Sequence, residues 1–231
     1  MEIFEYLKDS IPVDHHRQSR AIDMLREVLS IGFTPIQILD FGCGDGRTLP
    51  VFEKLLPGCE WIGVDIESSP EVNSRTKDDA RFVSYNGTTL PFSDSSFDLI
   101  YSHQVLEHVR HPEIILKEIR RVLRPGGYFV GQTSQFEPYH SFSLWNFTIY
   151  GFKRIIEDAG FKLEKIRPAI DGFTLMERTY RGRPKEFDRY AFEESPRNVE
   201  IENKAKSENK PIRVINYRKL MYAGVFSFVC A

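Results

Sequence analysis

The chain has 231 residues, 41% of them hydrophobic, which is enough to bury the core of one large domain or of one domain with an elaborated end. Its 31 basic and 33 acidic residues leave a formal net charge of −2, and this balance disfavours RNA or DNA as a substrate. The N-terminus is too charged for a signal peptide, no apolar run is long enough for a membrane span, and three cysteines without a Cys-x-x-Cys pair favour a reducing cytoplasm over structural zinc.

The N-terminal region is predicted to form a helix over 17–29. Apolar side chains recur there with the period of an α-helix, at Ala21, Ile22, Leu25, Val28 and Leu29. The simplest interpretation is a helix that packs against the edge of a sheet.

Three alternate glycines follow the first apolar run of the chain. Residues 38–41 predict a buried strand, Gly42, Gly44 and Gly46 a tight turn, and the amphipathic segment 47–56 a helix. Glycines in such a turn adopt positive φ and let the backbone approach a ligand closely, while the free N–H groups at the helix start favour polar or anionic ligand atoms. The spacing Gly-x-Gly-x-Gly differs from the Gly-x-Gly-x-x-Gly of dinucleotide-binding proteins, which disfavours a nicotinamide dehydrogenase.

A second strand is predicted over 60–65 and ends in Asp65, about twenty residues after the glycines. A carboxylate at the tip of this strand accepts hydrogen bonds from ribose hydroxyls in nucleotide-binding α/β folds. The polar stretch up to Asp78 and Asp79 predicts a short or irregular crossover. Periodicity predicts the remaining elements as strands at 81–85, 97–102, 128–133, 161–170 and 223–230, and as helices at 114–122 and 149–159, the last capped by Thr148.

These blocks resemble, in order and spacing, the class I S-adenosylmethionine-dependent methyltransferases of type 11. The resemblance covers about 37–133 and continues beyond Asp65 in Asn86-Gly87-Thr88-Thr89-Leu90-Pro91-Phe92, Ser96-Phe97-Asp98-Leu99-Ile100-Tyr101-Ser102, Leu106-Glu107-His108-Val109 and Arg121-Val122-Leu123-Arg124-Pro125-Gly126-Gly127. It implies an α/β fold with a seven-stranded, Rossmann-like, mostly parallel sheet, an antiparallel last strand and helices on both faces. It also implies S-adenosyl-L-methionine as the cofactor and S-adenosylhomocysteine as the product.

On this pattern the chain is one methyltransferase domain, 1–231. It divides into an N-terminal helical segment (1–30), a cofactor-binding core (31–170), a charged insert (171–215) and a closing strand (216–231). Half of the residues in 177–210 are charged, so we expect no core there and predict a solvated helical excursion or a mobile loop that could act as a lid.

The resemblance assigns the cofactor contacts to the strand tips. The residues expected to contribute are Asp40, Gly42, Cys43, Gly44, Gly46, Asp65, Ile66, Asn86, Gly87, Ser102 and His103. Asn86 stands where relatives commonly place an Asp against the adenine amino group; its amide oxygen can accept the same bond, and an ordinary Asn-Gly turn is an equal alternative. Arg17 or Arg20, in an N-terminal segment that often closes over the cofactor, could bind the methionine carboxylate.

The segment 136–148, which we call the acceptor loop, is the most informative about the methyl acceptor. It holds three Phe, one Tyr, one Trp and one His among polar residues, and it follows a strand tip on the cofactor face. Such a mixed surface suits a small hydroxylated molecule, although aromatic side chains that merely pack the loop remain an alternative. The segment resembles a loop of methyltransferases of sugar and polysaccharide biosynthesis, which implies a sugar-like acceptor.

A sugar hydroxyl is not ionised at neutral pH, so we expect a base near the acceptor. The candidates are His140, ranked first for its place in the acceptor loop, then His103 and His108, with Glu107 beside them. No Asp/His cluster with metal-ligand spacing is visible, so no metal is predicted.

Two other functions stay open. One is methyl transfer to a quinone or another lipid-like acceptor, and the other is a non-catalytic, S-adenosylmethionine-binding regulatory protein. The intact glycine turn and Asp65 argue against the second. The expected partner is a small-molecule acceptor, and the oligomeric state is not determined by the sequence.

Overall fold

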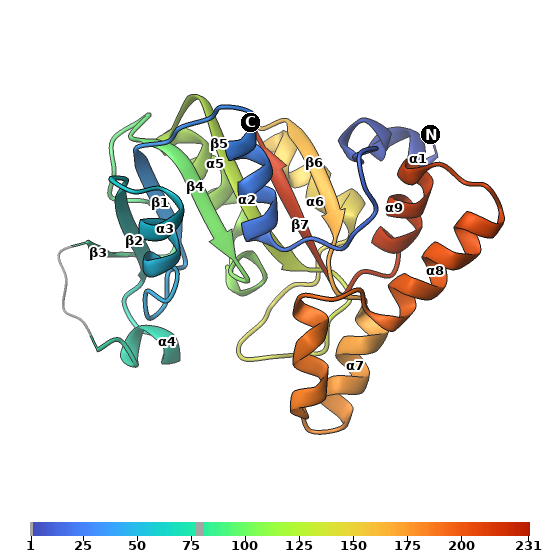
Figure 1. The fold of residues 1–231 in the computed structure, drawn as a ribbon. Helices are drawn as coiled ribbons and strands as arrows, with labels where there is room; N and C mark the ends of the chain where they lie inside the picture. The colour runs from blue at the N-terminus through green and yellow to red at the C-terminus, as the bar shows by residue number, and fades with distance from the viewer. Residues whose placement is uncertain (1, 77–80) are drawn as a thin grey trace.

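The computed structural model describes residues 2–76 and 81–231. A seven-stranded sheet in the order β3-β2-β1-β4-β5-β7-β6 runs through the molecule (Figure 1). Its strands are β1 (Gln37–Phe41), β2 (Glu60–Ile66), β3 (Phe82–Tyr85), β4 (Phe97–His103), β5 (Leu123–Ser134), β6 (Leu163–Pro168) and β7 (Val225–Cys230). Strands β1 to β5 pair in parallel, and β7 is antiparallel to both β5 and β6. The predicted fold class is therefore confirmed.

Helices cover both faces of the sheet because its central strands are apolar on both sides. Helices α2 (Ala21–Ser30) and α3 (Leu49–Leu55) cover one face, and α5 (Pro112–Val122) and α6 (Ile149–Asp158) cover the other (Figure 1). Alternate strand residues divide accordingly: Ile38 packs with α2 and α3, whereas Leu39 packs with α5 and α6. The short helices α1 (Ile3–Leu7) and η1 (Lys8–Ser10, a 3-10 turn) lie beside β6, where the Ser10 hydroxyl donates to the Leu163 carbonyl.

The strand order reverses between β1 and β4, and this position creates the site. Phe41, the last residue of β1, lies in register with Val64 of β2 on one side and Ser102 of β4 on the other. The carboxyl ends of the three strands therefore meet at one edge, at the switch point where ligands bind in open α/β sheets.

The starts of one helix and one strand differ from the predicted ranges by four residues or more. Helix α2 begins at Ala21 rather than at 17, because the chain before it is extended and the Ser19 N–H donates to the Pro168 carbonyl at the end of β6. Strand β5 begins at Leu123 rather than at 128, because Leu123 already pairs with Phe97 across an irregularity of the ladder. The crossover after β2 contains the short helix α4 (Pro70–Asn73), and Asp78 and Asp79 fall outside the described residues.

The charged insert, 171–215, forms helices, which is one of the two structures predicted for it. These are α7 (Gly172–Tyr180), η3 (Lys185–Ala191, a 3-10 helix), α8 (Pro196–Ser207) and α9 (Ile212–Leu220), which project together from one end of the sheet (Figure 1). Within 177–210, where no core is expected, the buried side chains are Ser195, Asn198 and Ala205, and none of them belongs to the hydrophobic core. Ala205 and Leu220 are fully buried, and Lys219 is buried because Glu194 and Glu202 lie 2.9 and 3.0 Å from its ammonium group.

The closing strand is shorter than 216–231. Residues 216–220 belong to α9, and β7 begins only at Val225. Asn216 keeps this part helical and tied to the N-terminal segment, because its side-chain amide donates to the carbonyls of Pro12 and His15. No helix formed by the described residues is long and apolar enough to cross a membrane.

Candidate active site

The glycine turn after β1 is a tightly packed structure in which side chains have no room. Gly42, Gly44 and Gly46 have φ of +76°, +52° and +81°. A Cβ atom on Gly42 would lie 2.2 Å from a methyl carbon of Val105, and one on Gly46 would lie 2.5 Å from the ring of Phe82. The turn therefore has no room for side chains at Gly42 and Gly46, and glycine there lets the backbone come close to a ligand.

Asp65 joins the tip of β2 to this turn. One carboxylate oxygen accepts the N–H of Gly44 at 2.7 Å and the other accepts the N–H of Ile66 at 2.8 Å. Burial raises the pKa of this carboxyl above its usual value, although the two N–H groups act in the opposite direction. A carboxylate has about four acceptor positions, so two remain for ligand hydroxyls.

Asp40 and Cys43 support the turn from below. Asp40 is only 2% exposed, and its carboxylate accepts the hydroxyl of Thr48 at the start of α3. Burial, with the nearby charge of Asp65, raises the pKa of Asp40 to about 7. Cys43 is buried beneath the turn, close to Gly63 of β2, and burial raises the pKa of its thiol.

Arg75 covers the turn from the solvent side, a role that the sequence did not indicate. Its guanidinium donates to the Gly44 carbonyl at 2.6 and 3.1 Å and stacks 4.0 Å from the centre of the Phe82 ring. Glu71 of α4 packs over Gly44 as well. No local pattern marks these residues, because they reach the turn only through the course of the crossover.

Asn86 adopts the ordinary Asn-Gly turn, one of the two alternatives left open by the sequence. Its amide oxygen accepts three hydrogen bonds, from the N–H and hydroxyl of Thr88 and from the N–H of Thr89, at 2.8 to 3.1 Å. Gly87 follows with φ of +86°. The side-chain oxygen is thus engaged within its own turn in this structure.

The tip of β4 holds an unusual backbone. Gln104 has φ of +58°, held by its N–H bond to the Gln132 carbonyl at 3.0 Å, and such left-handed non-glycine residues concentrate at functional sites. Ser102 is buried, and its hydroxyl has no hydrogen-bond partner among the described residues. His103 is exposed and lines a cavity, and desolvation and the cations Arg47 and Arg20 lower its pKa.

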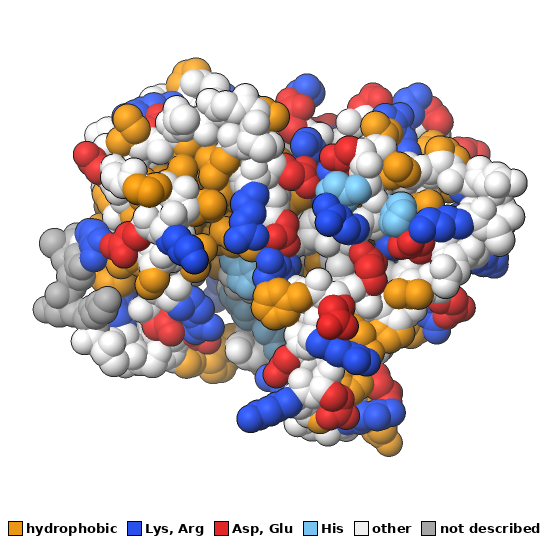
Figure 2. All heavy atoms as spheres, in the orientation of Figure 1, with side chains coloured by type: hydrophobic (Ala, Val, Ile, Leu, Met, Phe, Trp, Pro, Cys, Tyr) orange, Lys and Arg blue, Asp and Glu red, His pale blue; other side chains and the backbone are white. Residues whose placement is uncertain are grey.

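A cavity of about 910 Å³ opens beside His103 and Gln132, between the N-terminal segment with α2 and the helices α7 and η3. Figure 2 shows a hollow in the middle of this face with histidine side chains at its floor. The part of its wall that comes from the charged region carries the aromatic residues Phe187, Tyr190 and Phe192.

Arg17 and Arg20, the two residues considered for binding the methionine carboxylate, both line this cavity but have different partners. Arg20 forms a paired contact with Asp23, at 2.9 and 3.0 Å, and stacks on Phe192. Arg17 lines the same wall, is exposed, and has no ion-pair partner among the described residues. Arg17 is therefore the one whose charge remains available to an anionic ligand group.

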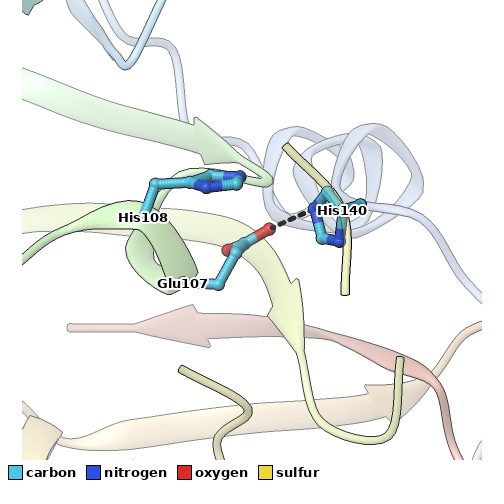
Figure 3. A group of neighbouring side chains, drawn as sticks. All are labelled: Glu107, His108 and His140. Carbon is cyan, nitrogen blue, oxygen red and sulfur yellow. Dashed lines mark ion pairs between the residues drawn. The ribbon is translucent and has the colours of Figure 1, made fainter. Parts of the chain in front are cut away.

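Glu107, His108 and His140 come together at the start of the acceptor loop (Figure 3). Nε2 of His140 lies 4.0 Å from a carboxylate oxygen of Glu107, and the two imidazole rings are 5.2 Å apart, edge to face. Glu107 is completely buried and accepts the Thr133 hydroxyl at 2.9 Å. Burial raises the pKa of Glu107 to about 7, and burial lowers the pKa of His108.

The sequence placed these residues near the acceptor but not in contact with one another. Glu107 and His108 belong to the 3-10 turn η2 (Leu106–His108), whereas His140 lies in a loop beyond β5. Backbone bonds join the two segments, because the N–H groups of Leu144 and Trp145 both donate to the Glu107 carbonyl, at 2.7 and 3.1 Å. The expectation of no metal-ligand cluster rested on sequence spacing, and the tertiary structure brings three potential ligands together.

The central part of the chain matches a known protein family. Residues 39–131 match the family described as methyltransferase domain. This region is a class I S-adenosylmethionine-dependent methyltransferase domain. The methyl donor of such a domain is S-adenosyl-L-methionine, and the glycine turn and Asp65 lie within the matched region.

Individual relatives of the methyltransferase domain agree with this. An uncharacterized methyltransferase of Schizosaccharomyces pombe is 36% identical over 104 residues, which cover 40% of this chain and 37% of that protein. The sterol 4-C-methyltransferase strm-1 of Caenorhabditis elegans is 30% identical over 102 residues, 41% of this chain and 30% of that protein. The aligned region therefore spans less than half the length of these relatives.

The fold extends beyond that shared region. The crystal structure of a putative sarcosine dimethylglycine methyltransferase from Galdieria sulphuraria superimposes with a TM-score of 0.59 at 15% identity. The superposition covers 91% of this chain and 84% of that one. The shared fold therefore extends beyond residues 39–131.

Proposed function

We propose that this chain transfers the methyl group of S-adenosylmethionine to a small hydroxylated acceptor. The observation that carries the proposal is the 2.7 Å bond from the Gly44 N–H to Asp65, which fixes a carboxylate beside the glycine turn at the switch point of the sheet. This arrangement suits a nucleoside whose ribose hydroxyls bind Asp65 and whose methionine part follows the turn toward β4.

The acceptor loop supports a sugar-like acceptor. Tyr139 and Phe142 are 72% and 71% exposed, so they do not serve to pack the loop. Exposed rings beside the polar groups of Glu137 and His140 offer stacking surfaces for the apolar faces of a sugar and hydrogen bonds for its hydroxyls.

Methyl transfer needs alignment and the loss of one proton. The acceptor oxygen forms a bond to the methyl carbon as the carbon–sulfur bond breaks, and S-adenosylhomocysteine leaves as a neutral thioether. Holding the two reactants in line supplies roughly 7–11 kcal/mol. The hydroxyl proton leaves at the cluster of Glu107, His108 and His140, which lies where the acceptor loop meets the tip of β5.

A lipid-like acceptor is the second candidate, because one relative of the methyltransferase domain is named as a sterol methyltransferase. That similarity covers 41% of this chain and 30% of that protein. A screen for methyl uptake from labelled cofactor, with nucleotide sugars in one arm and quinols and sterols in the other, separates the two. Uptake confined to the lipid arm would overturn the sugar-like assignment.

Asp65→Ala is expected to weaken the binding of S-adenosylhomocysteine by about 10- to 150-fold, since it removes a charged acceptor of ribose hydrogen bonds worth roughly 1.5–3 kcal/mol. Titration calorimetry measures the change, with far-ultraviolet circular dichroism to show that the variant is folded. Asp94→Ala is the control, because Asp94 is exposed and forms its ion pair with Arg121, away from the glycine turn. Unchanged affinity in a folded Asp65→Ala variant would rule out the proposed cofactor site.

A further inference from the structure

The side chains of Glu107, His108 and His140 offer three ligand atoms that all lie within 4.8 Å of one another. We propose that this cluster binds one divalent transition-metal ion. The inference deepens the proposed function, because such an ion would lie where the acceptor hydroxyl is activated. Its binding can nevertheless be measured without any acceptor.

The first argument is the uncompensated carboxylate. Glu107 is completely buried; in the part of the chain that the structure describes, it accepts the Thr133 hydroxyl at 2.9 Å and lies 3.4 Å from the Ser134 hydroxyl, which is closer to Glu137. Neither Lys nor Arg pairs with it in the part of the chain that the structure describes. A buried carboxyl group keeps its charge more readily when a cation lies beside it, and one carboxylate oxygen of Glu107 faces the imidazole of His140.

The second argument is the orientation of the His140 ring. Nδ1 of His140 points to the carbonyl of Pro138 at 3.4 Å and to a carboxylate oxygen of Glu137 at 3.7 Å, while Nε2 faces Glu107 (Figure 3). Metal-binding histidines typically engage their second nitrogen with a carbonyl or carboxylate in this way, which fixes the ring and leaves the first nitrogen for the ion.

The third argument is the scaffold. The backbone bonds of Leu144 and Trp145 to the Glu107 carbonyl hold the acceptor loop on η2, and the Trp145 indole adds a bond to the Val109 carbonyl at 2.8 Å. Ligand atoms around a tetrahedral ion at about 2.1 Å stand about 3.4 Å apart. Side-chain shifts of about 1 Å would therefore bring the three ligand atoms from within 4.8 Å of one another to the separation that an ion requires.

The ligand types indicate which ions fit. Two imidazoles and one carboxylate suit zinc, iron, cobalt or nickel, whereas magnesium and calcium prefer a full set of oxygen ligands. Three protein ligands also leave a coordination position open. An acceptor hydroxyl in that position would be polarised and would lose its proton more readily.

A second group with similar composition provides a contrast. Asp14, His15 and Glu27 also place their ligand atoms within 4.8 Å of one another. There the fully buried Arg167 already pairs with both carboxylates, at 2.7 Å to Asp14 and 3.0 Å to Glu27. Because its charge is already balanced, this group is not expected to bind an ion.

The test is titration of the full, untagged chain with Co²⁺, followed by visible absorption, and then displacement by Zn²⁺. We expect one Co²⁺ per chain, without the strong charge-transfer band of cysteine ligation. Glu107→Gln and His140→Ala should each weaken binding by at least about tenfold. His15→Ala, the matched control in the second group, should bind as wild type does.

Two outcomes would overturn the inference: no stoichiometric binding by the wild type, or a Glu107→Gln variant that binds Co²⁺ as tightly. Glu107→Gln preserves side-chain shape and can still accept the Thr133 hydroxyl, so loss of the fold is not a ready explanation; thermal unfolding checks this directly. Titration with S-adenosylhomocysteine in parallel separates the two proposals. Cofactor binding without metal binding would reject the ion alone, whereas loss of cofactor binding would reject the proposed function.

Discussion

His140→Ala is expected to slow methyl transfer by roughly 10²- to 10⁴-fold while cofactor affinity stays nearly unchanged. The acceptor hydroxyl is not ionised at neutral pH, and the variant lacks the imidazole that promotes its deprotonation, either directly or as a ligand of the inferred ion. His140 lies in the acceptor loop rather than at the glycine turn, so the cofactor site should not respond.

Single-turnover methyl transfer from labelled cofactor measures this rate once the acceptor screen has supplied a substrate. His111→Ala is the control, because His111 is exposed and approaches only Glu113 in the described structure. A His140→Ala rate within a few-fold of wild type would shift the catalytic assignment to His103 or His108. A variant that no longer binds S-adenosylhomocysteine would instead make His140 a structural residue.

The unfolding free energy is expected to fall by about 4 kcal/mol between about pH 4 and pH 7 because of Asp40 alone. Its pKa in the folded protein is about 7, against an ordinary value of 3.8, because burial disfavours the charged form. The folded state thus keeps a proton that the unfolded state releases as the pH passes 4. The stability from this group is fully present below that pH and is lost as the pH rises to 7.

Asp40→Asn should lack this dependence, since the amide does not titrate and its oxygen can still accept the Thr48 hydroxyl. Urea unfolding at several pH values from 5 to 8 gives the unfolding free energy of each protein as a function of pH. Below pH 7 the wild-type free energy should fall more steeply with pH, by a slope that corresponds to up to one proton. Asp94→Asn, at an exposed position, should follow the wild type. Parallel curves for wild type and Asp40→Asn would show that Asp40 is ionised in the folded protein.

Local sequence determined the elements that carry the cofactor site. The glycine turn needs only positive φ at successive glycines, and Asp65 follows from the length of one helix and one strand, so both are encoded by residues close together in the chain. The same holds for the start of α6, where the predicted cap is confirmed by the 3.0 Å bond from the Gly151 N–H to the Thr148 hydroxyl. Hydrophobic periodicity likewise predicted where the strands lie along the chain.

Only the tertiary structure decided what surrounds that site. Glu107 and His140 are far apart in the sequence, and no spacing rule connects a turn after β4 with a loop after β5; they meet because those strands are parallel neighbours. Lys219 and Arg167 are fully buried, although such side chains usually lie at the surface, because acidic side chains from distant segments pair with them. Pairing of this kind depends on the packing of the whole chain, whereas turns and caps depend on a few neighbouring residues.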